Sequence, residues 1–433
     1  MSKVFKVGVG REIISPPKGV KLYGYPSDRP NEGVRDDLTI NAIAFSNGKE
    51  TGIMMSADLC SLEKSLIDKM REGISVATGV EKLNICISAT HTHSGPIIAT
   101  VAGWGEADDS YIVDILIPQS IKAAKSAYES MIDAVMGVST VDSYVGMNRR
   151  QYSEKGGVGL GQNPFGIFDK TMTVLAFKDL DGNNIVNMIH YGCHGTAVGG
   201  ELLVTRDWPG VMVDRLETTT GAITVFFNGS EGDVGPRLSN GMTWGTHAFE
   251  EMEEIGSLAA LDATRAYRQI KEYREVDFKL VKGQITLPYE PLLTEDAVQK
   301  RLDEINAMPN LHDIYIREKS SLETILKMYK DKTKIETEKI IDQTMFAFNS
   351  TIFVPFQFEM FSSIALRLRQ FSPYQNTLCT CLTNASDGYL PAQEDLIRGG
   401  YEVAMFKGDI YKLKDNTDTT IIQENLRIMR ENQ

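Results

Sequence analysis

Four of the six histidines in this 433-residue chain fall in two short segments, each of which runs from apolar residues into a turn with glycine. The segments are Ile-Cys-Ile-Ser-Ala-Thr-His-Thr-His-Ser-Gly-Pro at 85–96 and Asn-Met-Ile-His-Tyr-Gly-Cys-His-Gly-Thr at 187–196. Such a pattern predicts a buried strand that ends in a loop, where catalytic side chains are often found. Residues two apart in an extended chain point the same way, so we expect His91 and His93 to share one face.

Imidazole is the commonest metal-binding side chain and the usual proton carrier near neutral pH. Two histidine segments at strand ends therefore favour a metal site with a proton donor beside it, as in a metallohydrolase. A single histidine on an apolar strand is more often a buried residue with a satisfied ring, so each segment alone is weak evidence. Cys193, in the second segment, could contact the metal, although a small buried strand residue is the more common role of such a cysteine.

Charge and length limit the classes of partner. The net charge of −13 argues against a nucleic-acid or anionic membrane surface, because both require clustered Lys and Arg. The N-terminus enters an alternating strand without an apolar leader, and no run is long enough to span a bilayer. We therefore expect a cytoplasmic protein that acts on a small molecule and has no stable membrane association. The sequence does not indicate an oligomeric state.

Hydrophobic periodicity predicts an α/β fold with a mixed β-sheet core packed by helices. Strands are expected at 5–9, 38–46, 51–57, 83–88, 134–140, 172–178, 184–189, 222–228, 350–356 and 376–383, and helices at 61–78, 111–131, 208–218, 250–272 and 418–432. Residues 294–343 are charge-rich and lack glycine, which predicts a helical hairpin covering the core. No break in composition divides the chain, so residues 1–433 are expected to form one domain.

Four landmarks occur in an order that resembles one known family. They are Ala-Thr-His-Thr-His-Ser-Gly-Pro at 89–96, His-Gly-Thr at 194–196, Gly-Asp-Val-Gly-Pro at 232–236, and Glu359 followed by Tyr389 and Tyr401. Together they resemble the N-terminal catalytic domain of the neutral/alkaline non-lysosomal ceramidases. The resemblance implies a mixed sheet packed by helices and a zinc amidase activity on the N-acyl bond of ceramide. The family's separate C-terminal β-sandwich is expected to be missing from this chain.

The resemblance also implies roles for seven residues. One zinc ion would be held by His91, His194, Glu359 and Tyr389, with His93 as the acid/base partner, Arg149 near the substrate carbonyl and Tyr401 at the oxyanion. This chemistry is consistent, because nitrogen and oxygen ligands that leave one position open are typical of catalytic zinc. A tetrahedral intermediate would also need donors at its oxygen.

One position departs from the family. Characterised members have a serine in the Gly-Asp-Val-Ser-Pro loop, where this chain has Gly235. We therefore expect a zinc-dependent hydrolase that uses metal-activated water on an amide, ester or related bond. Its substrate would be small and soluble, such as a sugar or cyclitol derivative. The alternatives are an N-acyl-lipid amidase of the ceramide type and a non-catalytic ligand-binding relative. Glu231 and Asp233 could act as polar contacts in place of the serine, or as surface and turn-capping residues.

Overall fold

The structure, a computed structural model, describes residues 4–25, 29–154, 156–238 and 247–432. Its centre is an eight-stranded sheet in the order β13-β11-β10-β6-β1-β3-β4-β5. In that order the strands are Ile223–Asn228, Asn184–Tyr191, Thr171–Asp179, Ile132–Asp142, Lys6–Ile13, Thr39–Ser46, Thr51–Ala57 and Ile85–Ala89. The pairs β11–β13 and β4–β5, at the two ends of this order, are parallel, and the pairs between them are antiparallel.

A second sheet packs against the first one. Its order is β15-β16-β17-β19, formed by Phe278–Pro288, Glu338–Phe348, Thr351–Pro355 and Asn376–Thr380. Aromatic side chains from both sheets fill the space between them, and the rings of Phe45 and Phe348 are 4.8 Å apart. Burial of such large side chains is the main stabilising contribution of this core.

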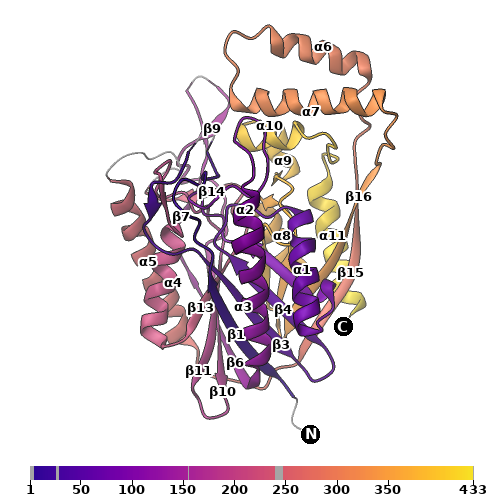
Figure 1. Cartoon of the computed structure of the whole chain (residues 1–433). Helices are drawn as coiled ribbons and strands as arrows, with labels where there is room; N and C mark the ends of the chain where they lie inside the picture. The colour runs from indigo at the N-terminus through magenta and orange to yellow at the C-terminus, as the bar shows by residue number, and fades with distance from the viewer. Residues whose placement is uncertain (1–3, 26–28, 155, 239–246, 433) are drawn as a thin grey trace.

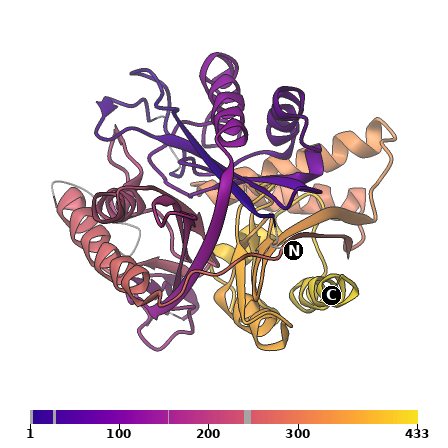
Figure 2. The ribbon, with the colours of Figure 1, turned by 90° about the horizontal axis from the view of Figure 1, so that it is seen from below.

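Helices cover the outer faces of both sheets (Figures 1 and 2). Helix α3 (Ile117–Glu129) lies over β1 and β3 and packs against α1 (Lys64–Thr78). Helices α4 (Asp207–Thr220) and α5 (Ala248–Gln269) lie over the β6, β10 and β13 side. Helices α8 (Ser362–Phe371) and α11 (Thr417–Glu431) pack together behind the second sheet, where α11 contacts β15. The α/β class with a helix-packed mixed sheet is confirmed.

The segment 294–343 differs in part from its expected form. Helices α6 (Glu295–Asn306) and α7 (Asp313–Lys330) pack on each other through a small apolar cluster and lie at the top of Figure 1. Residues 338–343, expected to be helical, instead begin strand β16. Burial alternates there, with Ile341 and Gln343 inward and Asp342 outward, and this two-residue period is that of a strand. No helix in the described part of the chain is long and apolar enough to cross a membrane.

The sheet curls so that its two ends approach each other. The Ser56 hydroxyl of β4 donates to the Phe226 carbonyl of β13 at 2.5 Å, and the Asn228 amide donates to the Thr90 carbonyl at 3.0 Å. The loops after β5, β11 and β13 therefore emerge side by side. The first two of these loops carry the two histidine segments, so the curl of the sheet brings both segments together.

Candidate metal centre

His91 stands two residues beyond β5, in a strained backbone conformation. Its φ is +67°, a left-handed value that is uncommon for a residue with a side chain. Its backbone N–H donates to the Leu59 carbonyl at 2.9 Å, and its side chain is buried. Strain of this kind costs on the order of 1–3 kcal/mol and is typical of functional sites.

The second histidine segment packs against the first through Gly195. Thr92 and Gly195 form a parallel bridge, and the His93 N–H donates to the Gly195 carbonyl at 3.1 Å. A Cβ atom at residue 195 would lie 2.8 Å from the His91 carbonyl oxygen, which is closer than real Cβ contacts allow. Glycine is therefore required here for the two loops to approach.

Three predicted ligands converge. Oε2 of Glu359 lies 3.4 Å from Nε2 of His91 and 3.3 Å from Nε2 of His194, and the donor atoms of these residues all lie within 4.8 Å of one another. Nε2 of His194 and Oε2 of Glu359 are buried and have no hydrogen-bond partner among the described residues. Buried polar atoms are normally paired, so two unpaired atoms facing each other fit a divalent cation.

The opposite ring nitrogens are fixed by backbone carbonyls. Nδ1 of His91 donates to the Cys60 carbonyl at 2.6 Å, and Nδ1 of His194 donates to the Glu231 carbonyl at 2.8 Å. A carbonyl only accepts, so each Nδ1 carries a proton, and Nε2 is the nitrogen that each ring directs at the converging point. This arrangement of a backbone acceptor behind a ligand histidine is common in metal sites.

The electrostatics of the three residues reflect their mutual contacts. Burial raises the pKa of the Glu359 carboxyl, but the charges and hydrogen bonds of His91 and His194 together outweigh burial, and the pKa lies well below its usual range. Burial lowers the pKa of His91, but its contacts with Glu359 and Cys60 together outweigh burial and raise the pKa well above normal. The pKa of His194 falls to about 3, because of burial and then the charge of Arg149. The site therefore favours an ionised Glu359 carboxylate between the buried rings of His91 and His194.

Tyr389 lies next to Glu359 in the fold. Strand β18 (Glu359–Met360) pairs in parallel with β20 (Tyr389–Leu390), and the two residues are partners in register. The Tyr389 hydroxyl accepts a hydrogen bond from Nη2 of Arg149 at 3.0 Å, and the Tyr401 ring stands 5.8 Å from the Tyr389 ring. The structure thus gathers both tyrosines and Arg149 beside the three converging ligands. Coordination by Tyr389 stays a prediction.

His93 joins the same cluster. Its Nε2 lies 3.2 Å from Nε2 of His91, while its Nδ1 donates to the Gly24 carbonyl at 2.9 Å. Burial, followed by the nearby His91, holds the pKa of His93 well below normal, so its ring is neutral. Gly24 has φ +112°, and a Cβ there would lie 2.5 Å from Cγ of His93. Glycine at this position lets the backbone hold the His93 ring.

Gly235 lies beside Arg149. It belongs to β14 (Val234–Pro236) and pairs with Met147 of β7 (Gly146–Asn148). A Cβ at residue 235 would meet Arg149 side-chain atoms at 3.6 and 3.8 Å, which is ordinary contact. Space for a Cβ atom is therefore present at this position, although a hydroxyl is not.

Glu231 and Asp233 are not surface residues, contrary to one of the expectations above. Both are buried because the loop after β13 folds under the site. Asp233 accepts hydrogen bonds from the backbone and hydroxyl of Ser362 and from the Asn148 amide. Burial raises the pKa of Asp233 to about 7 and that of Glu231 to about 8. Cys193 is also buried, and its thiol faces the His194 carbonyl at 3.6 Å.

Two further residues in the site were missed by the sequence analysis. The Glu402 carboxylate accepts a hydrogen bond from Nε of Arg149 at 3.0 Å. Cys60, whose carbonyl holds His91, also places its sulfur 3.7 Å from Nδ1 of that ring. Glu402 directly follows the predicted Tyr401, and this adjacency is the one signal in the sequence that could have indicated it.

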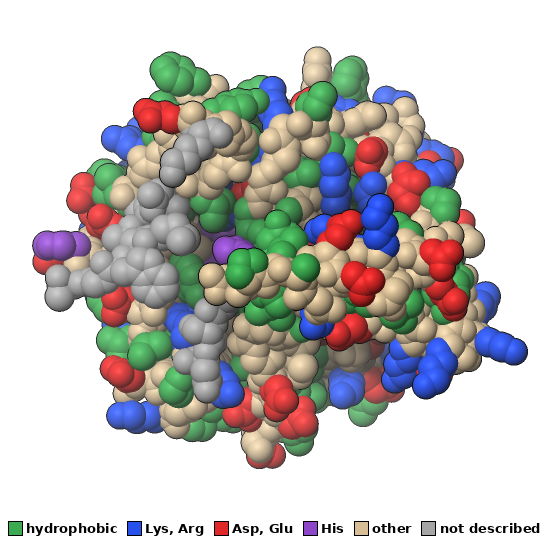
Figure 3. Space-filling view, turned by 90° about the horizontal axis from the view of Figure 1, so that it is seen from above, with side chains coloured by type: hydrophobic (Ala, Val, Ile, Leu, Met, Phe, Trp, Pro, Cys, Tyr) green, Lys and Arg blue, Asp and Glu red, His purple; other side chains and the backbone are tan. Residues whose placement is uncertain are grey.

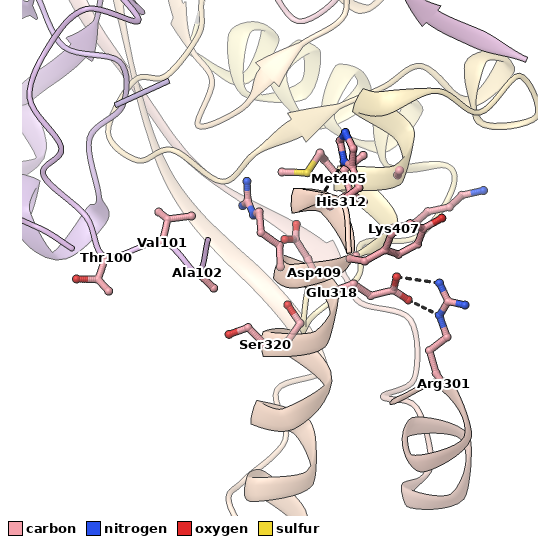
Figure 4. Close-up of a pocket in the computed structure, with 16 residues that line it drawn as sticks. Thr100, Val101, Ala102, Arg301, His312, Glu318, Ser320, Met405, Lys407 and Asp409 are labelled. Carbon is pink, nitrogen blue, oxygen red and sulfur yellow. Dashed lines mark hydrogen bonds and ion pairs between the residues drawn. The ribbon is translucent and has the colours of Figure 1, made fainter. Parts of the chain in front are cut away.

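The face of the molecule that contains these loops is hollowed. Figure 3 shows a histidine side chain inside the hollow, with hydrophobic side chains around it. A separate cavity of about 810 Å³ lies between α7, residues 100–102 and α10 (Tyr401–Lys407) (Figure 4). Its walls combine apolar side chains, such as Ile314 and Met405, with charged ones. The charged ones include Lys407, Asp409 and the ion pair between Arg301 and Glu318. The described residues that line it include no predicted site residue, but α10 connects the two regions.

The chain matches known proteins in sequence. Residues 5–251, more than half of the chain, match the model of the N-terminal domain of neutral/alkaline non-lysosomal ceramidases. The neutral ceramidase of Drosophila melanogaster is 26% identical over 266 residues, which cover 55% of this chain and 37% of the relative. The neutral ceramidase of Drosophila pseudoobscura pseudoobscura is 26% identical over 265 residues, with the same coverage. The match thus spans little more than a third of the length of these curated relatives.

The fold is also shared with solved structures. The neutral ceramidase from Pseudomonas aeruginosa superposes with a TM-score of 0.74 at 15% identity, covering 100% of this chain and 75% of that chain. A structure of a ceramidase complexed with C2 gives a TM-score of 0.73 at 15% identity, covering 99% and 76% of the two chains. At this identity the likeness concerns the fold.

Proposed function

The chain belongs to the neutral/alkaline non-lysosomal ceramidase family, and on this premise we propose that it is a zinc-dependent hydrolase of amide or related acyl bonds. The observation that carries the proposal is the convergence of His91, His194 and Glu359 on one point, with two buried atoms unpaired. Tyr389, adjacent to Glu359, would complete the ligand set. A donor set of nitrogen and oxygen atoms suits zinc.

The residues around this point fit hydrolysis of an acyl bond. Bound zinc would supply a Lewis acid and lower the pKa of a water molecule. The neutral His93 ring, with Nδ1 held by Gly24, can accept a proton at Nε2 and return it to the leaving group. Nη1 of Arg149 has no hydrogen-bond partner among the described residues, and it can donate to the carbonyl oxygen as negative charge develops there. Tyr401 would provide the second donor.

The substrate we propose is small and polar, for example an acylated sugar or cyclitol. Charged side chains in the cavity beside α10, such as Lys407 and Asp409, could contact polar groups of such a substrate. The second candidate is an N-acyl lipid such as ceramide, which the names of the relatives favour. A screen of purified protein against short N-acyl amides, esters, glycosides and ceramides in detergent would decide between them.

We expect one zinc ion per chain in protein purified without added metal. Elemental analysis before and after dialysis against a chelator would measure it, and activity should fall and return with the metal. His247→Ala is a suitable control, because that histidine is 80% exposed and lies outside the site. A metal-free chain whose fold and activity ignore chelators would rule the proposal out.

We also expect catalysis without a covalent acyl-enzyme, because Gly235 provides no hydroxyl in the 232–236 loop. Rapid-mixing kinetics should show no burst of the first product, and mass spectrometry should find no trapped adduct. Gly235→Ser should fold with a stability within about 1 kcal/mol of the natural chain, since its Cβ meets ordinary contacts. A large gain of activity in that variant would contradict direct attack by water.

A further inference from the structure

The Glu402 carboxylate is buried between two arginines. Its side chain is 1% exposed, and it accepts hydrogen bonds from Nε of Arg149 at 3.0 Å and from Nη1 of Arg150 at 2.6 Å. Each carboxylate oxygen thus serves a different arginine. Removing charges from water is costly, so buried ion pairs of this kind often add little to the stability of the fold. Their presence here therefore suggests a role other than stability.

Arg149 is fixed at two of its nitrogen atoms. Nε donates to Glu402, and Nη2 donates to the Tyr389 hydroxyl at 3.0 Å. Because the guanidinium is planar and rigid, two fixed donors set the direction of the whole group. An arginine guanidinium is not deprotonated in proteins. The group therefore stays charged, and its orientation depends on Glu402.

Arg150 holds Glu402 from the other side, away from the Tyr389 hydroxyl. Nη2 of Arg150 donates to the Gly399 carbonyl at 2.6 Å, and its guanidinium lies 5.0 Å from the Phe361 ring centre. Asp395 lies 3.7 Å from Nε of Arg150, and Asp395 forms no ion pair with Arg149. These contacts anchor Glu402 to the fold independently of the histidine cluster.

We infer that Glu402 is a positioning residue, which holds the Arg149 guanidinium in place so that Nη1 is free to contact the substrate's acyl oxygen. The inference rests on the proposed hydrolase function for its catalytic consequence. The placement of Arg149 by Glu402 is independent of that function, because it follows from the hydrogen bonds alone. A purely structural ion pair is the alternative, and its loss would lower stability without a selective effect on turnover.

The activity test is Glu402→Gln, which keeps the shape and removes the charge. We expect kcat to fall about 10–100-fold with zinc content unchanged, by analogy with the loss of hydrogen-bond partners of metal ligands. Glu402→Asp should recover part of kcat. Asp395→Asn is the matched control, because Asp395 pairs with Arg150 and Arg398 but not with Arg149, and it should keep kcat within about twofold. An equal loss in both variants would overturn the inference.

The second readout does not depend on activity. The Arg149 side-chain N–H signal, assigned by its absence in Arg149→Lys, should exchange slowly with solvent in the natural chain and at least tenfold faster in Glu402→Gln. Unchanged exchange in Glu402→Gln would overturn the positioning role. Faster exchange with unchanged kcat would overturn its catalytic consequence. If the natural chain has neither zinc nor hydrolase activity, the proposed function fails, and the exchange result still decides whether Glu402 holds Arg149.

Discussion

Glu359→Gln is expected to remove the metal and, with it, essentially all hydrolysis. The substitution keeps the side-chain shape but removes the negative charge that lies 3.4 and 3.3 Å from the His91 and His194 nitrogens. Loss of outer partners alone weakens metal binding about 10–100-fold, so loss of a ligand charge should weaken zinc affinity by at least about 100-fold.

Thermal unfolding with and without zinc provides a measurement that needs no substrate. A ligand that binds the folded state raises stability by about 2.7 kcal/mol at a hundred times its dissociation constant. The natural chain should therefore show a zinc-dependent rise in Tm, and Glu359→Gln should not. Glu250→Gln is the control, because Glu250 is exposed and pairs with the exposed His247. A full zinc response in Glu359→Gln would show that the metal is held elsewhere.

The local parts of the fold could be predicted from the sequence. Strands such as β3, β4, β5, β10 and β11 are short apolar runs between turns. Because both of their faces are buried, their sequences are almost continuously apolar and can be recognised as strands. The second sheet was harder to predict. Strand β15 was not anticipated and the start of β16 was assigned to a helix, because outward Lys, Gln and Asp residues give these strands the composition of a solvated helix.

The candidate site divides in the same way. His91, His93 and His194 could be predicted from residues alone, because each segment is a local pattern that ends a strand. Glu359 and Tyr389 came only from the family resemblance, since neither has a local pattern that indicates a ligand. Glu402 was not predicted from the sequence. Its contact with Arg149 joins residues 253 positions apart, and such a contact is set by the packing of α10.

His93→Ala is expected to lower kcat about 10²–10⁴-fold while the chain retains its zinc, which is the contribution typical of a general acid–base group. The His93 ring is neutral, with Nδ1 held by the Gly24 carbonyl and Nε2 directed at the His91 ring. It can therefore exchange a proton at Nε2 without being needed to complete the ligand set.

Position alone does not distinguish a proton carrier from a ligand here. Nε2 of His93 lies as near to Nε2 of His91 as Oε2 of Glu359 does. Parallel measurements on His93→Ala and His194→Ala separate the two roles. His194→Ala should lose both zinc and activity, whereas His93→Ala should lose activity alone. His93→Gln extends the comparison, since its amide can still accept a hydrogen bond from a substrate but cannot carry a proton, and it should be as slow as His93→Ala. If His93→Ala loses zinc as fully as His194→Ala does, His93 is a ligand and the proton must be carried by another group.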